Sequence, residues 1–298
     1  MDKPMNTPAI AIFAYRRPQA LQACLASLAA CAGANTLDAT VFVDGPADVA
    51  EQALVEETAR VAEAFKGFRT FEVRRAETHL GLGESVIRGI SHVLETHPSV
   101  IVLEDDLTVQ PGFLRFILDG LDRYSEDRRV FSVCGYTNRI RIPEGYPADA
   151  YFCPRSSSWG WGTWKDRWDS VDWEPTPADW AKYRRAFAAW GGSDCPGLLR
   201  DWMEGKNASW AIRFCFSQFR QGKLSLFPVR SLVDASAEFD GSGTNCLRYN
   251  RFRFDMDDRP GPFRYPDTVE VAPALRRSAL RYHSVPLRAW TRLRNLFA

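Results

Sequence analysis

The first half of the chain alternates short apolar runs with amphipathic segments of helical period, and this alternation restricts the folds open to it more than any other feature. The apolar runs have the length of strands, and four of them lie at 9–15, 39–45, 69–75 and 99–106. A strand that is followed by a helical crossover returns parallel to the strand before it. The pattern therefore predicts an α/β fold with a mainly parallel sheet, helices on both of its faces, and a ligand site at the carboxyl ends of the strands.

Residues that recur every three or four positions mark the inner faces of three helices between these strands. They are Leu21, Leu25 and Leu28 in the first helix, Leu54, Thr58, Val61 and Phe65 in the second, and Val86, Ile90 and Val93 in the third. We expect each of these residues to face the sheet.

Composition excludes several classes of protein. Hydrophobic residues make up 45 % of the 298 residues and charged residues 25 %, as in ordinary globular proteins, and a net charge of +1 argues against a globally basic nucleic-acid binder. The seven cysteines are scattered and form no CxxC pair, which favours buried reduced thiols over a disulfide framework. No segment approaches the ~20 apolar residues that a membrane span requires, so we expect a cytoplasmic protein.

The pattern of predicted strands and the density of tryptophans change after residue 126. Shorter strands are predicted at "VFSVCGY" and "AYFCP", and eight of the ten tryptophans lie between residues 159 and 202. Tryptophans pack cores, but a flat indole face also stacks on sugar rings while its N–H donates to a hydroxyl. We expect both uses, with one or two tryptophans at a ligand and an acceptor lying over residues 159–164.

The segment 276–298 has six arginines, no acidic residue and several large apolar residues. This pattern is typical of a basic amphipathic helix that lies on a membrane surface. A helix that is solvated or docked on the core would have the same composition, and the sequence does not separate these alternatives.

Three adjacent carboxylates, Glu104, Asp105 and Asp106, end the fourth apolar run, and Asp44 ends the second run at the same edge of the predicted sheet. Adjacent acids repel one another, so a fold that gathers them at a strand end is expected to hold something positive there. Mg²⁺ and Mn²⁺ prefer oxygen ligands and share their remaining positions with water and phosphate oxygens. A helix cap at Asp106 and a plain turn at Asp44 would explain the same residues without a ligand.

The order of five motifs resembles that of the GT-A-fold glycosyltransferases. The motifs are "AYRRP" (14–18), "VDG" (43–45), "HLGLGESVIRGI" (79–90), "VLEDDLTVQPGFL" (102–114) and "SSWGWGTW" (157–164). The pattern is most similar to bacterial family-2-like sugar transferases and to the animal N-acetylglucosaminyltransferase that acts on N-glycans. The resemblance covers residues 8 to 245.

The resemblance implies a role for each acid. Asp106 matches the metal ligand of the family's Glu-Asp-Asp or Asp-x-Asp motif and would act in catalysis through Mn²⁺ or Mg²⁺ bound to the donor diphosphate. Glu104 and Asp105 match acids that contact the ribose and the sugar of the donor. Asp44 matches an aspartate that accepts a hydrogen bond from the base, usually uracil, which favours a UDP-sugar as donor.

Two arginines are implied on the nucleotide side of the site. Arg17 follows the first strand and matches an arginine near the nucleotide, and Arg88 matches loosely a basic residue near the diphosphate. A salt bridge at a helix start would also account for Arg17.

The implied activity is transfer of a hexosyl or N-acetylhexosaminyl group, with inversion, to a glycan or lipid-linked glycan, as in polysaccharide biosynthesis at the inner face of a membrane. A nucleotide-sugar-binding half would occupy residues 1–126, a tryptophan-rich acceptor half residues 127–255, and a tail with the basic helix, a candidate peripheral membrane contact, residues 256–298. No nucleic acid is expected as a partner.

The resemblance fails at the general base that an inverting transferase needs. The animal enzyme's base motif, Trp-Asp-Asp-Trp, falls on Trp210–Arg213 ("WAIR"), which contains no carboxylate. Asp201, Glu204 and Asp240 lie nearby, and we favour Asp201 because it follows a helical segment that enters the acceptor half; a plain surface acid is its alternative. For the whole chain, the alternative is a non-catalytic relative that binds a sugar nucleotide or a glycan.

Overall fold

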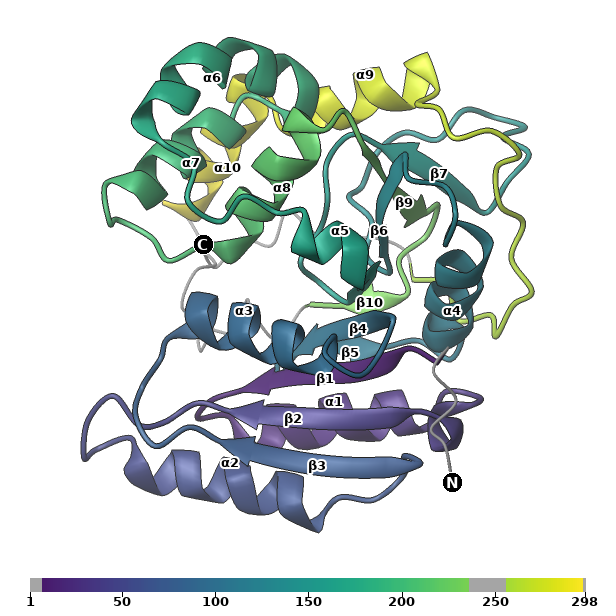
Figure 1. Ribbon diagram of the computed structural model, residues 1–298. Coiled ribbons are helices and arrows are strands. Elements are labelled where there is room, and N and C mark those ends of the chain that lie inside the picture. The colour runs from purple at the N-terminus through teal and green to yellow at the C-terminus, as the bar shows by residue number, and fades with distance from the viewer. Residues whose placement is uncertain (1–6, 236–255, 297–298) are drawn as a thin grey trace.

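The computed structural model describes residues 7–235 and 256–296 (Figure 1). Its centre is an eight-stranded sheet with the order β3-β2-β1-β4-β8-β6-β9-β7. The strands are β1 (Ala9–Ala14), β2 (Asp38–Val43), β3 (Thr70–Arg75), β4 (Ser99–Glu104), β6 (Val130–Cys134), β7 (Ala150–Cys153), β8 (Trp161–Trp164) and β9 (Leu224–Pro228). Two short strands, β5 (Thr108–Val109) and β10 (Val233–Asp234), form a separate antiparallel pair.

The half of the sheet that is built from the first four strands is parallel throughout. Its register places Phe13 of β1 opposite both Phe42 of β2 and Glu104 of β4. Beyond β4 the sheet is mixed, because β8 runs antiparallel to β4 and β6, β9 runs parallel to β6, and β7 runs antiparallel to β9. The predicted α/β fold is confirmed with a Rossmann-like parallel half, and the antiparallel strands are confined to the second half.

Helices cover both faces of the sheet, as predicted. They are α1 (Pro18–Ala29), α2 (Gln52–Ala64), α3 (Leu82–Val93), α4 (Phe113–Arg123), α5 (Lys165–Asp169), α6 (Pro177–Gly191), α7 (Cys195–Met203), α8 (Trp210–Arg220), α9 (Pro273–Tyr282) and α10 (Val285–Asn295). Alternate residues of β1 serve the two faces: Ile10 and Ile12 pack with α1, α2 and α4, whereas Ala11 and Phe13 pack with α3 and α8. β1 is therefore buried along its whole length.

The inner faces predicted for α1 and α3 are confirmed, because all six residues are buried. The face predicted for α2 is partly wrong. Its buried residues are Val55, Thr58, Ala59 and Ala62, while Leu54 is 44 % exposed. Small Ala59 and Ala62 belong to the same apolar cluster as the buried residues of α1, so the helix turns its small side chains toward α1 rather than its largest ones.

Three of the eight tryptophans between residues 159 and 202 are buried, and the other five are half-buried and pack against apolar clusters. Trp161, Trp164 and Trp168 are buried, and Trp161 stacks on Trp210 with 5.2 Å between ring centroids. Residues 161–164 form the central strand β8, so the expectation that an acceptor lies over residues 159–164 is wrong for all but the start of that segment. Among these residues Trp159 stays half-buried, outside the strand.

The predicted single basic helix is two helices. α9 ends at Tyr282, and α10 begins with Val285 and has Pro286 in its first turn, where proline cannot continue a preceding helix. Leu275 and Tyr282 of α9 are buried, whereas α10 has no buried residue. α9 is therefore docked on the core, whereas α10 is exposed, and contact of α10 with a membrane stays a prediction.

Six cysteines in the described ranges are buried and free, in line with the prediction of reduced thiols, and Cys246 lies outside these ranges. Within residues 7–235 and 256–296, no helix has both the length and the apolar character needed to cross a bilayer.

Candidate functional site

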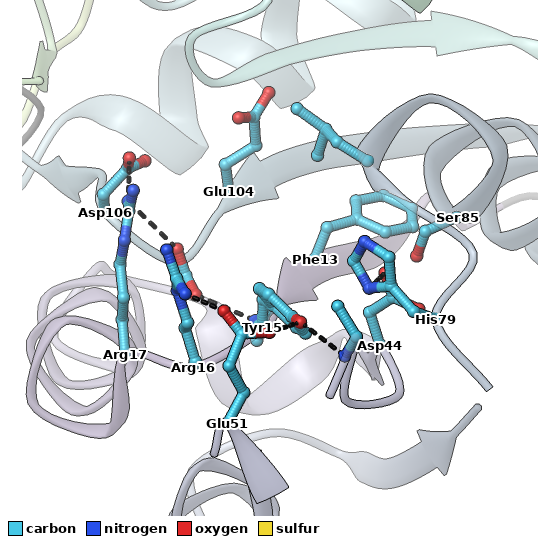
Figure 2. A pocket seen from close by; sticks show the side chains of 14 residues that line it. Phe13, Tyr15, Arg16, Arg17, Asp44, Glu51, His79, Ser85, Glu104 and Asp106 are labelled. Carbon is cyan, nitrogen blue, oxygen red and sulfur yellow. Dashed lines mark hydrogen bonds and ion pairs between the residues drawn. The ribbon is translucent and has the colours of Figure 1, made fainter. Parts of the chain in front are cut away.

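A cavity of about 330 Å³ lies where β1, β2 and β4 end (Figure 2). Its polar lining comes from the turn after β1, the loop between β2 and α2, the loop between β3 and α3, the first turn of α3 and the end of β4. These lining residues are Tyr15, Arg16, Arg17, Asp44, Glu51, His79, Ser85, Glu104, Asp105 and Asp106. Five of the seven site residues that the sequence predicted therefore meet here, namely Arg17, Asp44, Glu104, Asp105 and Asp106.

The acid cluster at the end of β4 is held by β1 and by the start of α1. The backbone N–H of Asp105 donates to the carbonyl of Phe13 at 2.9 Å, and the backbone N–H of Tyr15 donates to Oδ2 of Asp105 at 3.0 Å. Arg17 donates through Nη1 to Oδ2 of Asp106, and the same nitrogen lies 3.7 Å from Oδ1 of Asp105. Asp105 and Asp106 are both buried at the base of the cavity, so this arginine compensates charge that is largely shielded from water.

Burial, and after it the negative charge of Asp106, raises the pKa of Asp105 to about 7. The backbone N–H of Tyr15 and the guanidinium of Arg17 lower this pKa but do not outweigh the other two causes. With this pKa, Asp105 is partly protonated near neutral pH, so the cluster carries less negative charge than three ionised acids would.

Asp106 can supply one part of the coordination shell of a divalent cation. Oδ1 of Asp106 is buried and has no hydrogen-bond partner among the described residues, so one oxygen of this carboxylate can accept a further ligand. The described ranges contain no group of three or more acidic, histidine or cysteine side chains arranged around a common point for a metal. This donor set suits Mg²⁺ or Mn²⁺, which keep several waters and share substrate phosphates, and does not suit a closed protein cage.

Asp44 holds the loop between β3 and α3. Its Oδ1 accepts from the backbone N–H groups of Gly45 at 2.9 Å and Leu80 at 2.8 Å, and its Oδ2 accepts from that of Gly81 at 2.9 Å. Nδ1 of His79 lies 3.0 Å from the same Oδ2. The carboxylate that was predicted to contact a base thus already serves four polar groups of the protein, and it shapes the cavity by placing His79.

Five polar residues of the lining were not among the predicted site residues, namely Tyr15, Arg16, Glu51, His79 and Ser85. Tyr15 donates from its hydroxyl to Glu51, accepts there from the N–H of Ala47 at 2.9 Å, and lies 4.9 Å from His79 between ring centroids. Arg16 also pairs with Glu51. Tyr15 and Arg16 stand beside the predicted Arg17 and could have been included, whereas nothing in the local sequence singles out Glu51.

Arg88 and Asp201 lie away from this cavity. The side chain of Arg88 is 65 % exposed and pairs with Glu84 one turn earlier on α3. Asp201, on α7, pairs with the neighbouring Arg200 and lines no cavity described here. Asp240, another candidate base, lies outside the described residues.

A second cavity, of about 190 Å³, belongs to the second half of the sheet. Because β8 runs antiparallel to β4 with Trp161 opposite Val102, the segment before β8 extends toward the end of β4 that carries the acids. That segment supplies Ser156, Ser157, Ser158 and Trp159 to the cavity, and Tyr136 and Ser209 add two more hydroxyls. Its lining, drawn from the described residues, includes no carboxylate.

Comparison with known proteins gives a fold likeness only. No family model matches the sequence, and no curated protein does. Solved structures do match, among them the crystal structure of S. aureus TarS, with 10 % sequence identity and a TM-score of 0.42 over 76 % of this chain. The match spans 36 % of the TarS chain, well under two thirds of its length.

Proposed function

We propose that the protein is a metal-dependent glycosyltransferase that moves a sugar from a nucleotide-sugar, UDP-linked, to a glycan or lipid-linked glycan. The observation that carries the proposal is the convergence of Arg17, Asp44 and the three acids of β4 on one cavity at the carboxyl edge of the parallel half-sheet. In open α/β sheets this edge is where nucleotides bind. A surface turn or a helix cap would not gather residues from three separate strand ends.

The chain's own residues supply most of what a nucleoside diphosphate needs. Arg17 can turn its guanidinium from Asp106 to phosphate oxygens, which it matches in shape and charge. The ring of Tyr15 offers an apolar surface beside His79, and the loop that Asp44 holds closes this side of the cavity. A Mn²⁺ or Mg²⁺ ion on Asp106 would stabilise charge on the departing diphosphate.

The second cavity has the chemistry of an acceptor site. Hydroxyls of Ser157 and Tyr136 can exchange hydrogen bonds with sugar hydroxyls, and Trp159, which packs edge-on against Tyr136 at 4.5 Å between centroids, offers an indole face for stacking. We assign this cavity to the glycan. Hexosyl and N-acetylhexosaminyl donors both remain within the proposal, as does inversion at the anomeric carbon.

The test is a screen of nucleotide-sugars with Mn²⁺ that measures released nucleoside diphosphate. We expect turnover with at least one uridine-linked donor, and a loss of about 100-fold or more in Asp106→Asn, since removing one group that stabilises developing charge costs that much. Asp169→Asn removes an exposed acid that pairs with Lys165 on α5 and should leave turnover unchanged. Turnover that survives in Asp106→Asn would contradict the role of this residue.

A non-catalytic sugar-nucleotide or glycan binder is the second candidate. It is favoured by one observation, that neither Trp210–Arg213 nor the lining of the second cavity offers a carboxylate as general base. Isothermal calorimetry separates the two: a wild-type protein that binds UDP with Mn²⁺ but releases no nucleoside diphosphate from any donor is a binder.

A further inference from the structure

The fold holds α10 by the side that carries Leu287, Arg288 and Thr291. Ser193, between α6 and α7, donates from its hydroxyl to the carbonyl of His283 at 2.8 Å and accepts from Nη2 of Arg288 at 3.1 Å. Leu287 and Thr291 lie on the same side of α10 as Arg288 and are half-buried. None of the residues of α10 is buried, so the core does not account for the apolar side chains of this helix.

Those apolar side chains form one stripe on the solvent side. At 3.6 residues per turn, Val285, Ala289, Trp290, Leu293 and Leu296 fall within a continuous arc of about 140°. The four large ones are exposed, at 59 % for Val285, 52 % for Trp290, 46 % for Leu293 and 78 % for Leu296. An ordinary surface helix has the reverse arrangement, with its apolar stripe against the core.

Positive charge borders this stripe. The same helical geometry places Arg292 on one side of the arc and Arg294 on the other, and Arg288 lies beyond Arg292. The segment 276–298 has six arginines and no acidic residue, although the whole chain has a net charge of only +1. Arg292 and Arg294 therefore border the exposed apolar stripe, and the segment has no acidic residue to neutralise them.

We propose that α10 docks on the surface of an anionic lipid bilayer, with Trp290, Leu293 and Leu296 in the interface and the flanking arginines against acidic headgroups. Tryptophan and leucine side chains insert at this depth, and basic residues gain from the negative surface potential. A second copy of the chain is the other occupant to consider. A two-fold contact through α10 would bring two sets of these arginines together without a compensating acid from this segment, so charge favours the lipid surface.

Docking would also place the second cavity near the lipid surface. The meaning of this placement for an acceptor rests on the proposed function, whereas the docking itself does not. His283 lines the second cavity, and α10 begins two residues after it. A helix of 11 residues is about 16 Å long. The proposed acceptor cavity would then open within about one helix length of the headgroups, which suits an acceptor sugar carried on a lipid.

Flotation of the full chain with lipid vesicles tests the docking without reference to transferase activity. We expect binding to vesicles of phosphatidylcholine with about 30 % phosphatidylglycerol, and little binding to phosphatidylcholine alone. Each arginine near such a surface contributes about five-fold to partitioning, so Arg292→Gln with Arg294→Gln should bind about 25-fold more weakly. Trp290→Ala with Leu293→Ala should weaken binding at least about ten-fold. Raising the salt concentration should weaken wild-type binding, because it screens the headgroups.

Two matched controls keep the test specific. Arg184→Gln with Arg185→Gln removes the same charge from exposed positions on α6, and Leu54→Ala removes an exposed leucine from α2; both should bind as the wild type does. Equal binding to neutral vesicles, or undiminished binding of either α10 double variant, would overturn the proposal. A third outcome would also overturn it: the protein binds no vesicle, and light scattering shows a dimer that Leu293→Ala dissociates. Thermal melting confirms that each variant is folded, and the salt series on the wild type decides the question should a variant fail to fold.

Discussion

Replacing Asp44 by asparagine separates two roles that this residue can have in the cavity at the ends of β1, β2 and β4. Sequence resemblance assigns Asp44 to the base of the nucleotide, whereas the structure shows its carboxylate serving the N–H groups of Gly45, Leu80 and Gly81 and facing Nδ1 of His79. An asparagine of the same shape has one acceptor oxygen instead of two. Whichever way the amide is turned, at least one backbone N–H that is buried or half-buried then faces an NH₂ group that cannot accept its hydrogen bond.

The expected cost follows from these bonds. A hydrogen bond to a charged acceptor contributes about 1.5–3 kcal/mol, and a buried N–H left without a partner costs about 1–3 kcal/mol. We therefore expect Asp44→Asn to lower the free energy of unfolding by about 3 kcal/mol. Asp48→Asn is the matched control, because Asp48 is exposed and accepts from the N–H groups of Ala50 and Glu51 at 2.9 and 3.1 Å, a capping role that asparagine fills equally well.

The assay has two parts, urea denaturation followed by tryptophan fluorescence, and calorimetric titration with UDP and with CDP in the presence of Mn²⁺. If Asp44 acts by holding the loop, Asp44→Asn loses stability and binds both nucleotides more weakly by a similar factor. If Asp44 instead accepts a hydrogen bond from the base, the stability of Asp44→Asn changes little and only its preference for UDP over CDP is lost. The second pattern would refute the reasoning from the loop contacts.

Two further substitutions test packing and charge elsewhere. Arg69, through its hydrogen bonds, holds the pKa of Asp38 well below its usual range, so this carboxylate stabilises the fold fully above about pH 4 and progressively less as the pH falls through its folded-state pKa. Asp38→Asn should cost about 3 kcal/mol at pH 7 and reduce the loss of stability between about pH 5 and pH 2, as measured by urea denaturation across that range. Gly89→Ala would place a Cβ 2.5 Å from the ring of Phe13 and should cost about 1–2 kcal/mol, whereas Gly197→Ala, which meets nothing within 4 Å, should be neutral or stabilising in the same assay.

The alternation of strands and helices was enough to predict the parallel half of the fold, because each buried strand is marked by its own residues. The bounds of β1 to β4 differ from the predicted runs by at most two residues at each end. The inner face of α2 was partly missed because the buried positions include Ala59 and Ala62, which the search for large residues passed over. The place of β8 between β4 and β6 depends on long-range pairing, which no local pattern in the sequence records.

The place of Asp44 and of the three acids at the cavity was predicted because they follow strand ends, whereas Glu51 and His79, which lie on loops, were missed. The roles of these residues toward a ligand stay predictions. Asp44 and Asp106 follow directly from the rule that parallel strands present their carboxyl ends at one edge. Glu51 reaches the cavity only because the loop after β2 folds back onto Tyr15. The position of Arg88 was foreseeable, because a residue two places from buried Val86 and Ile90 points about 200° away from them on a helix, toward solvent.

The way in which the fold tolerates three adjacent acids argues that their place at the cavity is functional. The ion pair of Asp38 shows how this fold compensates a carboxylate that serves structure alone, since Arg69 binds both oxygens, at 2.9 and 2.8 Å, and Thr70 adds a third bond. At the end of β4 the compensation is incomplete, because Asp105 has its pKa raised to about 7 and Oδ1 of Asp106 has no hydrogen-bond partner among the described residues. A cation at Asp106, or phosphate oxygens at Arg17, would complete it. Under the proposed function, a metal and a diphosphate would bind at this residual charge, and each would favour the binding of the other.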